Sequence, residues 1–428
     1  MADVLLINFP FHAKGMPRIL PIQFAAIGSH LASRGHHVRV VDLNLERRED
    51  LFALLARRRF DVVGISYRNV LPMFWLERFR SLRELVVQLN RLGVDPIVGG
   101  PGFSLFQPAI FRWVPELNVG AIGEGEITME RFVEGHALAD IPGLCYRTAS
   151  GVACNYPPKF LDGEAIPAYC DIEGLRFDDS AYLVGLQSYR GCNWQCSYCP
   201  SSFLRGSGQR LRPLAHVEQD LLFLRDKGVR HFILIDGVGN DPPERSRELM
   251  SLFQRLDFPA SWEGFLKPLP SVDEAAVDEY ARSKAVRFHI DVVSGVKSIA
   301  DRIGHGVEFH EALRVGRLLK RRDIEGLFYF AYQLPGETLR DEWTTFRHLH
   351  AINRIGQPTY IYPFFPYPGT AFEKEYGSIL SKGVFWHLRR MAGMILRPSF
   401  LWFLKNLFTL SEVTGPRHPR IKRGDMPS

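Results

Sequence analysis

Three cysteines lie close together near the middle of the chain. Cys192, Cys196 and Cys199 have the spacing C-x3-C-x2-C on one short segment, 190–200. Thiolates are soft ligands that favour iron–sulfur clusters or zinc. Three of them on one loop can bind three corners of a [4Fe-4S] cubane and leave the fourth iron open to another molecule. Because structural zinc usually takes four protein ligands, the spacing favours the iron–sulfur cluster.

The other three cysteines lie upstream of this segment. Cys145, Cys154 and Cys170 have no regular spacing to one another and do not obviously complete a zinc site. Six cysteines in 428 residues, three of them clustered, argue against a disulfide framework and for a metal site in a reducing compartment. A structural zinc and three unrelated buried cysteines stay open as alternatives to the cluster.

The cysteine segment resembles the signature of the radical S-adenosylmethionine (SAM) superfamily, including the aromatic residue, Tyr198, before the last cysteine. The resemblance implies that the open iron binds the amino and carboxylate groups of SAM. An electron from the cluster then breaks a carbon–sulfur bond and leaves a carbon radical. An electron donor such as flavodoxin or ferredoxin is implied as a partner.

Later segments resemble the same family in order and spacing. Phe232–Gly237 is similar to the family's second barrel strand, whose end holds the SAM amino group, and Asp236 and Gly237 match those positions. A loop cap is the alternative role for Asp236. The turn with Pro335 resembles the family's turn near the adenine, and 365–370 resembles the turn after the sixth strand. Each segment by itself is also compatible with a plain turn.

One segment departs from the family pattern. Relatives usually carry Glu-Ser-Gly after the fourth barrel strand, near the SAM ribose and carboxylate. Here Val293 stands where that Glu would be, and Ser294 is the remaining candidate contact. The departure leaves open how SAM is held and which of its carbon–sulfur bonds breaks.

The resemblance covers about 183–375 and implies a partial (β/α)6 barrel, with the cysteine loop after its first strand. The chain independently alternates strand and helix patterns over this range, including helical patterns at Ala215–Lys227 and Pro243–Leu256. Six strand candidates are Leu183–Ser188, Phe232–Ile235, Ala260–Leu266, Phe288–Val293, Leu327–Tyr332 and Tyr360–Phe364.

Strand and helix patterns also alternate over roughly the first 135 residues. This alternation predicts a parallel, doubly wound (Rossmann-like) sheet with ligands at the carboxyl ends of the strands. The strand candidates are Val4–Ile7, Val38–Asp42, Val62–Ser66, Pro96–Gly100 and Val119–Ile122.

This region resembles the cobalamin-binding domain that precedes many radical SAM domains. The resemblance is carried by 35–38, 61–66, 99–104 and 123–126. Glycines at strand ends let the backbone approach a large planar cofactor, and serines can hydrogen-bond its nucleotide tail. Ordinary turns of a doubly wound sheet are the alternative. The candidate cobalamin-binding residues are Ser66, Gly99, Gly100, Ser104, Gly123 and Glu124.

Two further residues bear on the cofactor. Many cobalamin domains supply an axial histidine from a D-x-H-x-x-G loop, but here Pro10 stands where the Asp would be, before His12. Without that carboxylate the imidazole lacks the partner that orients it, so we expect cobalamin without histidine ligation. Arg68 follows the third strand and is suited either to a substrate anion or to a structural salt bridge.

Composition is that of an ordinary soluble globular protein, with 46% apolar and 23% charged residues and a net charge of +6. No signal peptide, uncharged 18-residue span or nucleic-acid-binding motif is evident, so we expect a cytoplasmic enzyme that does not bind nucleic acid. The expected domains are a cobalamin-binding domain (1–138), a linker with a small hairpin (139–182), a barrel (183–375) and a helical extension (376–428).

The combined reading is a cobalamin-dependent radical SAM methyltransferase that acts on an unactivated carbon of a small-molecule or lipid-like substrate. Aromatic residues near the sixth strand, among them Phe364 and Tyr367, are suited either to contact an apolar or planar substrate or to pack in the core. Radical SAM chemistry other than methylation, such as a rearrangement or transfer of the 3-amino-3-carboxypropyl group, stays open. A non-catalytic iron–sulfur or zinc protein is the alternative from another class.

Overall fold

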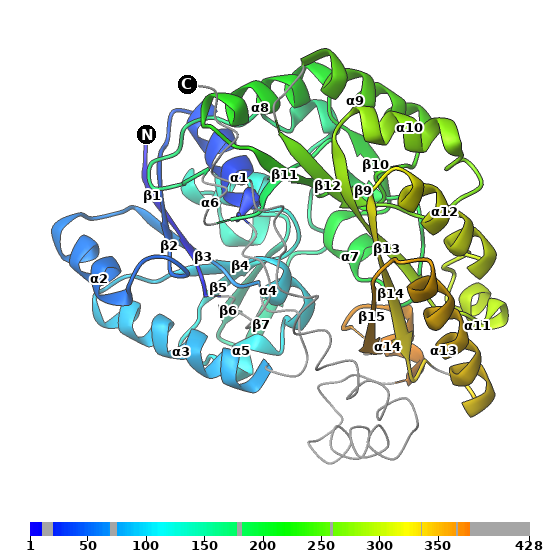
Figure 1. Cartoon of the computed structure of the whole chain (residues 1–428). Coiled ribbons are helices and arrows are strands. Elements are labelled where there is room, and N and C mark those ends of the chain that lie inside the picture. The colour runs from blue at the N-terminus through cyan, green and yellow to red at the C-terminus, as the bar shows by residue number, and fades with distance from the viewer. Residues whose placement is uncertain are drawn as a thin grey trace.

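The computed structural model describes residues 1–10, 20–68, 75–177, 182–256, 260–334, 336–364 and 367–376. Two α/β units form the molecule, and each is built around its own sheet (Figure 1). The predicted combination of a doubly wound domain and a partial barrel is confirmed. His12 and most of the predicted helical extension lie outside the described residues.

The first sheet has seven strands in the order β2-β1-β3-β4-β5-β6-β7. Its first five strands are parallel, apolar runs buried between layers of helices, as the continuous Val, Leu and Ile content predicts. The last two strands pair antiparallel at one edge. The strands are β1 (Asp3–Asn8), β2 (His37–Asp42), β3 (Val62–Ser66), β4 (Ile97–Gly99), β5 (Val119–Ala121), β6 (Leu144–Thr148) and β7 (Gly151–Cys154).

Helices cover both faces of this sheet. One face packs against α1 (Ile22–Ser33) and α6 (Glu126–Val133). The other packs against α2 (Arg48–Arg57), α3 (Trp75–Arg91), α4 (Pro101–Phe106) and α5 (Ile110–Trp113). The strand order reverses between β1 and β3, so the ligand crevice of this fold type lies at their carboxyl ends.

The cysteines upstream of the cluster segment require a correction. Cys145 on β6 and Cys154 on β7 are direct cross-strand partners, and they form a disulfide. The expectation that the cysteines outside the cluster segment form no disulfide is therefore wrong for this pair. The separation of nine residues in the sequence did not indicate this pairing, because it is the register of the hairpin that brings the two Cβ atoms together.

The second sheet has six parallel strands in the order β15-β14-β13-β12-β11-β8, which is chain order from one edge to the other. All six predicted barrel strands are present, and helices wrap the outer face (Figure 1). The strands are β8 (Val184–Leu186), β11 (His231–Leu234), β12 (Ser261–Phe265), β13 (Ala285–Val293), β14 (Glu325–Tyr332) and β15 (Thr359–Pro363). The covering helices are α8 (Leu214–Asp226), α9 (Pro243–Leu256), α10 (Glu274–Arg282), α12 (Phe309–Arg321) and α13 (Leu339–Arg354).

Alternation along these strands separates the helix-packed core from the barrel interior. On β13, Phe288, Ile290 and Val292 belong to the core beneath the helices. Because side chains alternate across a strand, His289 and Asp291 face the interior. Within the part of the chain described here, no helix is long and apolar enough to cross a membrane.

Candidate functional site

The cysteine loop begins in a small antiparallel pair of strands, β9 (Tyr189–Cys192) and β10 (Gly208–Leu211). A Cβ at Gly191 would lie 1.9 Å from the carbonyl oxygen of Gly208, so only glycine permits this pairing. Cys196 and Cys199 follow before α7 (Ser201–Arg205). All three cysteines are partly exposed thiols.

Hydrogen bonds anchor the loop to two neighbouring barrel loops. The Ser197 backbone N–H donates to the Ile303 carbonyl at 2.9 Å. The Trp194 indole N–H donates to Asp241 at 2.9 Å. These contacts fix the loop between its cysteines, which a cluster ligand set requires.

Lys267 supplies a positive charge beside this loop, and the sequence analysis missed it. Its Nζ lies 3.2 Å from the centroid of the Trp194 ring, and the residue is buried. Burial raises the pKa of Cys196, while the Lys267 charge acts in the opposite direction. Burial likewise raises the pKa of Cys199 to about 11. One feature of the sequence could have indicated Lys267. It follows a predicted barrel strand at its carboxyl end, where barrel enzymes place functional groups.

These thiols fit a cubane cluster. Among the described residues, no three His, Cys, Asp or Glu side chains converge on a point that could hold a single metal ion. A cubane binds each thiolate at a different iron, so its ligands need not converge. Cys192, Cys196 and Cys199 would hold the cluster, with the Lys267 charge offsetting part of its negative charge.

Asp236 and Gly237 lie next to the cysteine loop at the end of β11. The Asp236 carboxylate accepts the backbone N–H groups of Ser188 at 2.8 Å and Tyr189 at 3.2 Å, and also the Ser188 hydroxyl. Burial raises the pKa of Asp236 to about 6. A Cβ at Gly237 would lie 3.7 Å from Cys192 Sγ. Asp236 therefore holds the start of the loop, and Gly237 brings backbone beside the first cysteine.

Tyr198, within the loop, packs near the end of β13, where Val293 and Ser294 lie. Tyr198 packs on the small core that also contains Val293. Val293 has a φ of 63° at a register shift between β13 and β14, a left-handed conformation that β-branched residues rarely adopt. The Ser294 hydroxyl accepts the Val296 N–H at 3.1 Å, so it caps a turn. Pro335 lies outside the described residues.

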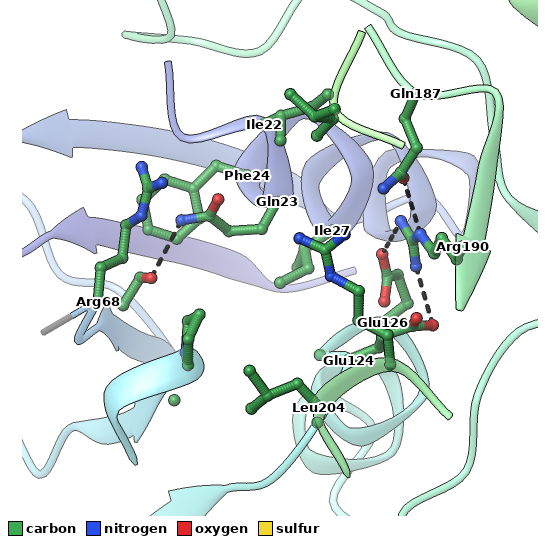
Figure 2. A pocket seen from close by; sticks show the side chains of 18 of the residues that line it. Ile22, Gln23, Phe24, Ile27, Arg68, Glu124, Glu126, Gln187, Arg190 and Leu204 are labelled. Atoms are coloured by element: carbon green, nitrogen blue, oxygen red, sulfur yellow. Dashed lines mark hydrogen bonds and ion pairs between the residues drawn. The ribbon is translucent and has the colours of Figure 1, made fainter. Parts of the chain in front are cut away.

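A cavity of about 540 Å³ lies at the carboxyl ends of both sheets (Figure 2). Seven of the residues predicted to bind a cofactor line it together with Cys199. Arg68 also lines it, and its role as an anion-binding residue stays a prediction. The seven predicted residues are Ser66, Gly99, Gly100, Gly123, Glu124, Asp236 and Gly237.

Ser104 does not line the cavity but holds two of the turns that do. Its hydroxyl donates to the Gly100 carbonyl at 3.0 Å and accepts the Gly123 N–H at 2.9 Å, and the side chain is fully buried. It therefore ties together the turns after β4 and β5. Ser66 faces the cavity and accepts a hydrogen bond from the Gln23 amide at 3.1 Å.

Gly100 forms a tight turn in the cavity wall, packed against the end of β3. Gly100 has a φ of 92°, and a Cβ there would lie 2.9 Å from both Ser66 Oγ and the Tyr67 carbonyl oxygen. No other residue type fits this turn without displacing β3. The backbone of Gly99 and Gly100 forms a turn in the cavity wall, called the cradle below, and its contact with a corrin stays a prediction.

Glu124 makes a contact that sequence reasoning did not anticipate. Its carboxylate pairs with Arg190 at 3.0 Å and with Arg210 at 2.6 Å. Arg190 also binds Glu126 at 2.8 Å and the Gln187 side chain at 2.9 Å (Figure 2). All of these charges are largely buried. Arg190 lies two residues before the first cluster cysteine, so the pairs fix the glycine turns relative to the cysteine loop.

Replacing Gly100 by Ala is expected to weaken corrinoid retention about tenfold, because the added Cβ displaces Ser66 and strains the cradle. Corrinoid absorbance after desalting measures the effect. Gly93→Ala is the matched control, since Gly93 has a φ of 76° but no atom within 4 Å of its Cβ position. Equal retention by the two variants contradicts a corrin surface at Gly100.

Two family models match this chain. The radical SAM superfamily model matches residues 186–349, and the B12 binding domain model matches residues 17–133. The first range contains the three cysteines and most of the barrel, and the second contains the glycine cradle.

Two relatives are similar to this chain over most of its length. An uncharacterized methyltransferase of Pyrococcus horikoshii is 22% identical over 363 residues, which span 82% of this chain and 77% of that protein. A cytidylyl-2-hydroxyethylphosphonate methyltransferase of Streptomyces wedmorensis is 32% identical over 69% of this chain and 66% of that protein.

A solved structure shares both domains. It is the radical SAM methyltransferase TsrM of Kitasatospora setae with cobalamin and a [4Fe-4S] cluster bound. It superposes with a TM-score of 0.76 at 21% identity, covering 88% of this chain and 78% of that one. The chain described here belongs to the radical SAM enzymes that carry an N-terminal cobalamin-binding domain.

Proposed function

We propose that this cobalamin-dependent radical SAM methyltransferase acts on an unactivated carbon of a small-molecule or lipid-like substrate. One observation carries the proposal: a single cavity is lined both by Cys199 and Gly237 beside the cluster loop and by Gly99 and Gly100 of the cradle. A methyl acceptor in this space has access to both cofactor surfaces.

When bound, the cluster with SAM supplies radical chemistry and cobalamin supplies a methyl carrier. The chain itself contributes position and environment. Three thiols hold the cluster, Lys267 places a positive charge beside it, and the Arg190–Glu124 pair fixes the distance between the two cofactor surfaces. Apolar side chains such as Ile22 and Phe24 line the cavity and exclude water from it.

Other radical chemistry on SAM is the second candidate. Val293 stands where relatives usually carry a carboxylate near SAM, and its φ of 63° is unusual for a β-branched residue. Transfer of the 3-amino-3-carboxypropyl group or a rearrangement would then take the place of methylation. A flavodoxin or ferredoxin as electron donor, the absence of a nucleic-acid partner and a cytoplasmic location stay predictions.

The deciding experiment is an anaerobic incubation of the reconstituted protein with methyl-labelled SAM, reductant and cobalamin. We expect the label to appear on the bound corrinoid together with S-adenosylhomocysteine, and 5′-deoxyadenosine as the second SAM product. Methylthioadenosine as the main product contradicts methylation and indicates aminocarboxypropyl transfer. The Gly100→Ala protein should show weaker corrinoid labelling but keep SAM cleavage, since the cradle lies in the other domain.

A further inference from the structure

An aromatic row crosses the inner face of the barrel on four neighbouring strands. It consists of Phe265 (β12), His289 (β13), Tyr329 (β14) and Tyr360 (β15). Phe265 pairs in register with His289, and Tyr329 pairs with Tyr360. Their outward neighbours belong to the core beneath the helices, so the row itself faces the interior.

The rings of the aromatic row contact one another in sequence. Ring centroids lie 5.2 Å apart for Phe265 and His289, 5.9 Å for His289 and Tyr329, and 5.8 Å for Tyr329 and Tyr360. His289 Nδ1 and the Tyr329 hydroxyl are hydrogen-bonded at 2.8 Å, which fixes the middle of the row. Phe265 and Tyr360 are each 37% exposed, although large apolar groups inside a barrel are normally covered.

Asp291 lies beside this row and, unlike the other carboxylates of the inner face, has no partner among the described residues. Glu325 is paired with Arg287, and buried Glu263 lies within 4 Å of Arg287 and His289. Asp291 is exposed to the interior and makes no hydrogen bond or ion pair with any described residue.

The energetics of Asp291 indicate a missing partner. Desolvation raises the pKa of Asp291 to about 6, and the charges of His289 and Lys267 act in the opposite direction. The carboxylate is nevertheless open to the cavity, where a charged group without a described partner can pair with a ligand. A cationic ligand would supply the pairing that the described chain does not.

The cavity connects this carboxylate with the cofactor surfaces. Asp291 and Phe265 line the same 540 Å³ cavity as Cys199 and Gly100. Asp291 follows β13 two residues beyond His289, toward the carboxyl end where the cysteine loop lies. A molecule lying on Phe265 therefore sits within the space that the proposed reaction uses.

We propose that the barrel interior binds the methyl acceptor as a planar or aromatic molecule that carries a cationic nitrogen, with its ring against Phe265 at the end of the aromatic row and its nitrogen paired with Asp291. This inference rests on the proposed function and names its substrate class. An aromatic wall with an adjacent carboxylate matches such a ligand in both parts, because the rings attract the cation and the planar surface, and the carboxylate fixes the nitrogen.

The SAM ribose is the other source of hydrogen-bond donors near Asp291. SAM would also partner the carboxylate, through a ribose hydroxyl or through its own sulfonium or ammonium charge, so SAM is kept bound to the protein in the test below. Asp291→Asn distinguishes the two sources. If the carboxylate binds SAM, the substitution weakens SAM binding. If it binds the acceptor, the substitution removes the preference for cationic ligands.

The test uses the full-length protein loaded with cluster, cobalamin and SAM, and two probes of similar size and opposite charge, 2-phenylethylamine and 3-phenylpropionate. Equilibrium dialysis should show the amine bound at least about tenfold more tightly than the acid. Asp291→Asn should remove this preference and leave SAM retention unchanged. Glu325→Gln, on the same inner face but at a carboxylate already paired with Arg287, should keep the preference.

A second variant tests the aromatic part. Phe265→Leu should weaken both probes to a similar extent, because it removes ring contact but no charge. Equal binding of amine and acid by the unmodified protein overturns the proposal, as does an Asp291→Asn protein that loses SAM but keeps the amine preference. Unchanged iron content and circular dichroism exclude misfolding of the variants. The labelled-SAM experiment is scored separately, so a failed methylation with an intact amine preference rejects the reaction and not the binding site.

Discussion

Replacement of Cys196 by Ala is expected to abolish SAM cleavage. The loop supplies three thiols, and a cubane that loses one of them loses the ligand set that leaves a single iron open. Iron and sulfide analysis after anaerobic reconstitution should give about four of each per chain for the unmodified protein and much less for the variant. Production of 5′-deoxyadenosine measures the cleavage.

The remaining cysteines provide the controls. Cys170→Ala should retain cleavage, because that thiol contacts the Ser29 hydroxyl far from the loop. Cys145→Ala and Cys154→Ala should also retain it, since these residues form the hairpin disulfide. Full SAM cleavage by the Cys196→Ala protein rejects the cluster assignment.

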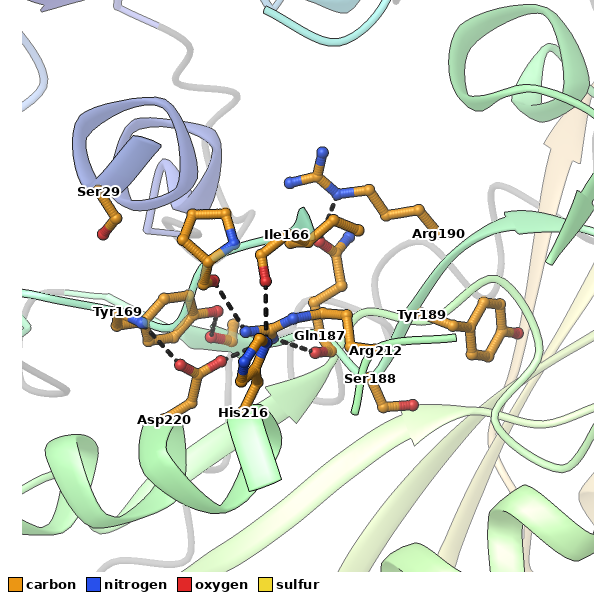
Figure 3. Close-up of polar contacts among 12 residues, drawn as sticks. Ser29, Ile166, Tyr169, Gln187, Ser188, Tyr189, Arg190, Arg212, His216 and Asp220 are labelled. Carbon is orange, nitrogen blue, oxygen red and sulfur yellow. Dashed lines mark hydrogen bonds and ion pairs between the residues drawn. The ribbon is translucent and has the colours of Figure 1, made fainter. Parts of the chain in front are cut away.

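The second large effect is expected at Asp220, where replacement by Ala should lower the free energy of unfolding by about 3–5 kcal/mol. Asp220 and Arg212 form a fully buried pair with an N–O distance of 2.7 Å (Figure 3). Arg212 also donates to the carbonyls of Gln187 at 2.6 Å and Pro167 at 2.9 Å, and Asp220 accepts the Tyr169 N–H at 2.7 Å. The variant would leave the Arg212 charge buried without its partner.

This network joins the segment between the two domains to the first barrel strand and α8, so its loss should loosen the start of the barrel. Urea unfolding followed by circular dichroism measures the change. Asp226→Ala on the same helix is the matched control, because that carboxylate is exposed and should change stability by less than about 0.5 kcal/mol. A similarly small change for Asp220→Ala would show that the buried pair does not stabilise this junction.

Local sequence patterns were enough to predict the strands and the cysteine loop. Runs such as Val4–Ile7 and Val62–Ser66 are apolar at successive positions, and only a strand covered on both faces accommodates them. The cluster cysteines lie within eight residues, so their chemistry depends little on the rest of the fold. The glycines at 99 and 100 mark a strand end, and the left-handed φ at Gly100 is the physical reason for a glycine there.

Long-range contacts were beyond the reach of the same patterns. Glu124 and Arg190 are 66 residues apart, and either is compatible with a solvated surface until the two domains meet. Cys145 and Cys154 required the hairpin register before their pairing became visible. Lys267 was not foreseen either, because a single lysine after a strand has no periodicity to mark it.

The sequence by itself determined that the protein has two parallel α/β units, a three-thiol loop and glycine turns at strand ends, because each of these is a property of a few adjacent residues. Only the tertiary structure decided which side chains share the cavity. Phe265 and Asp291 line it from two strands separated by a helix, and the strand register brings both to one inner face. Register and domain contact depend on packing of the whole chain, and that packing left Asp291 facing the cavity without a partner among the described residues.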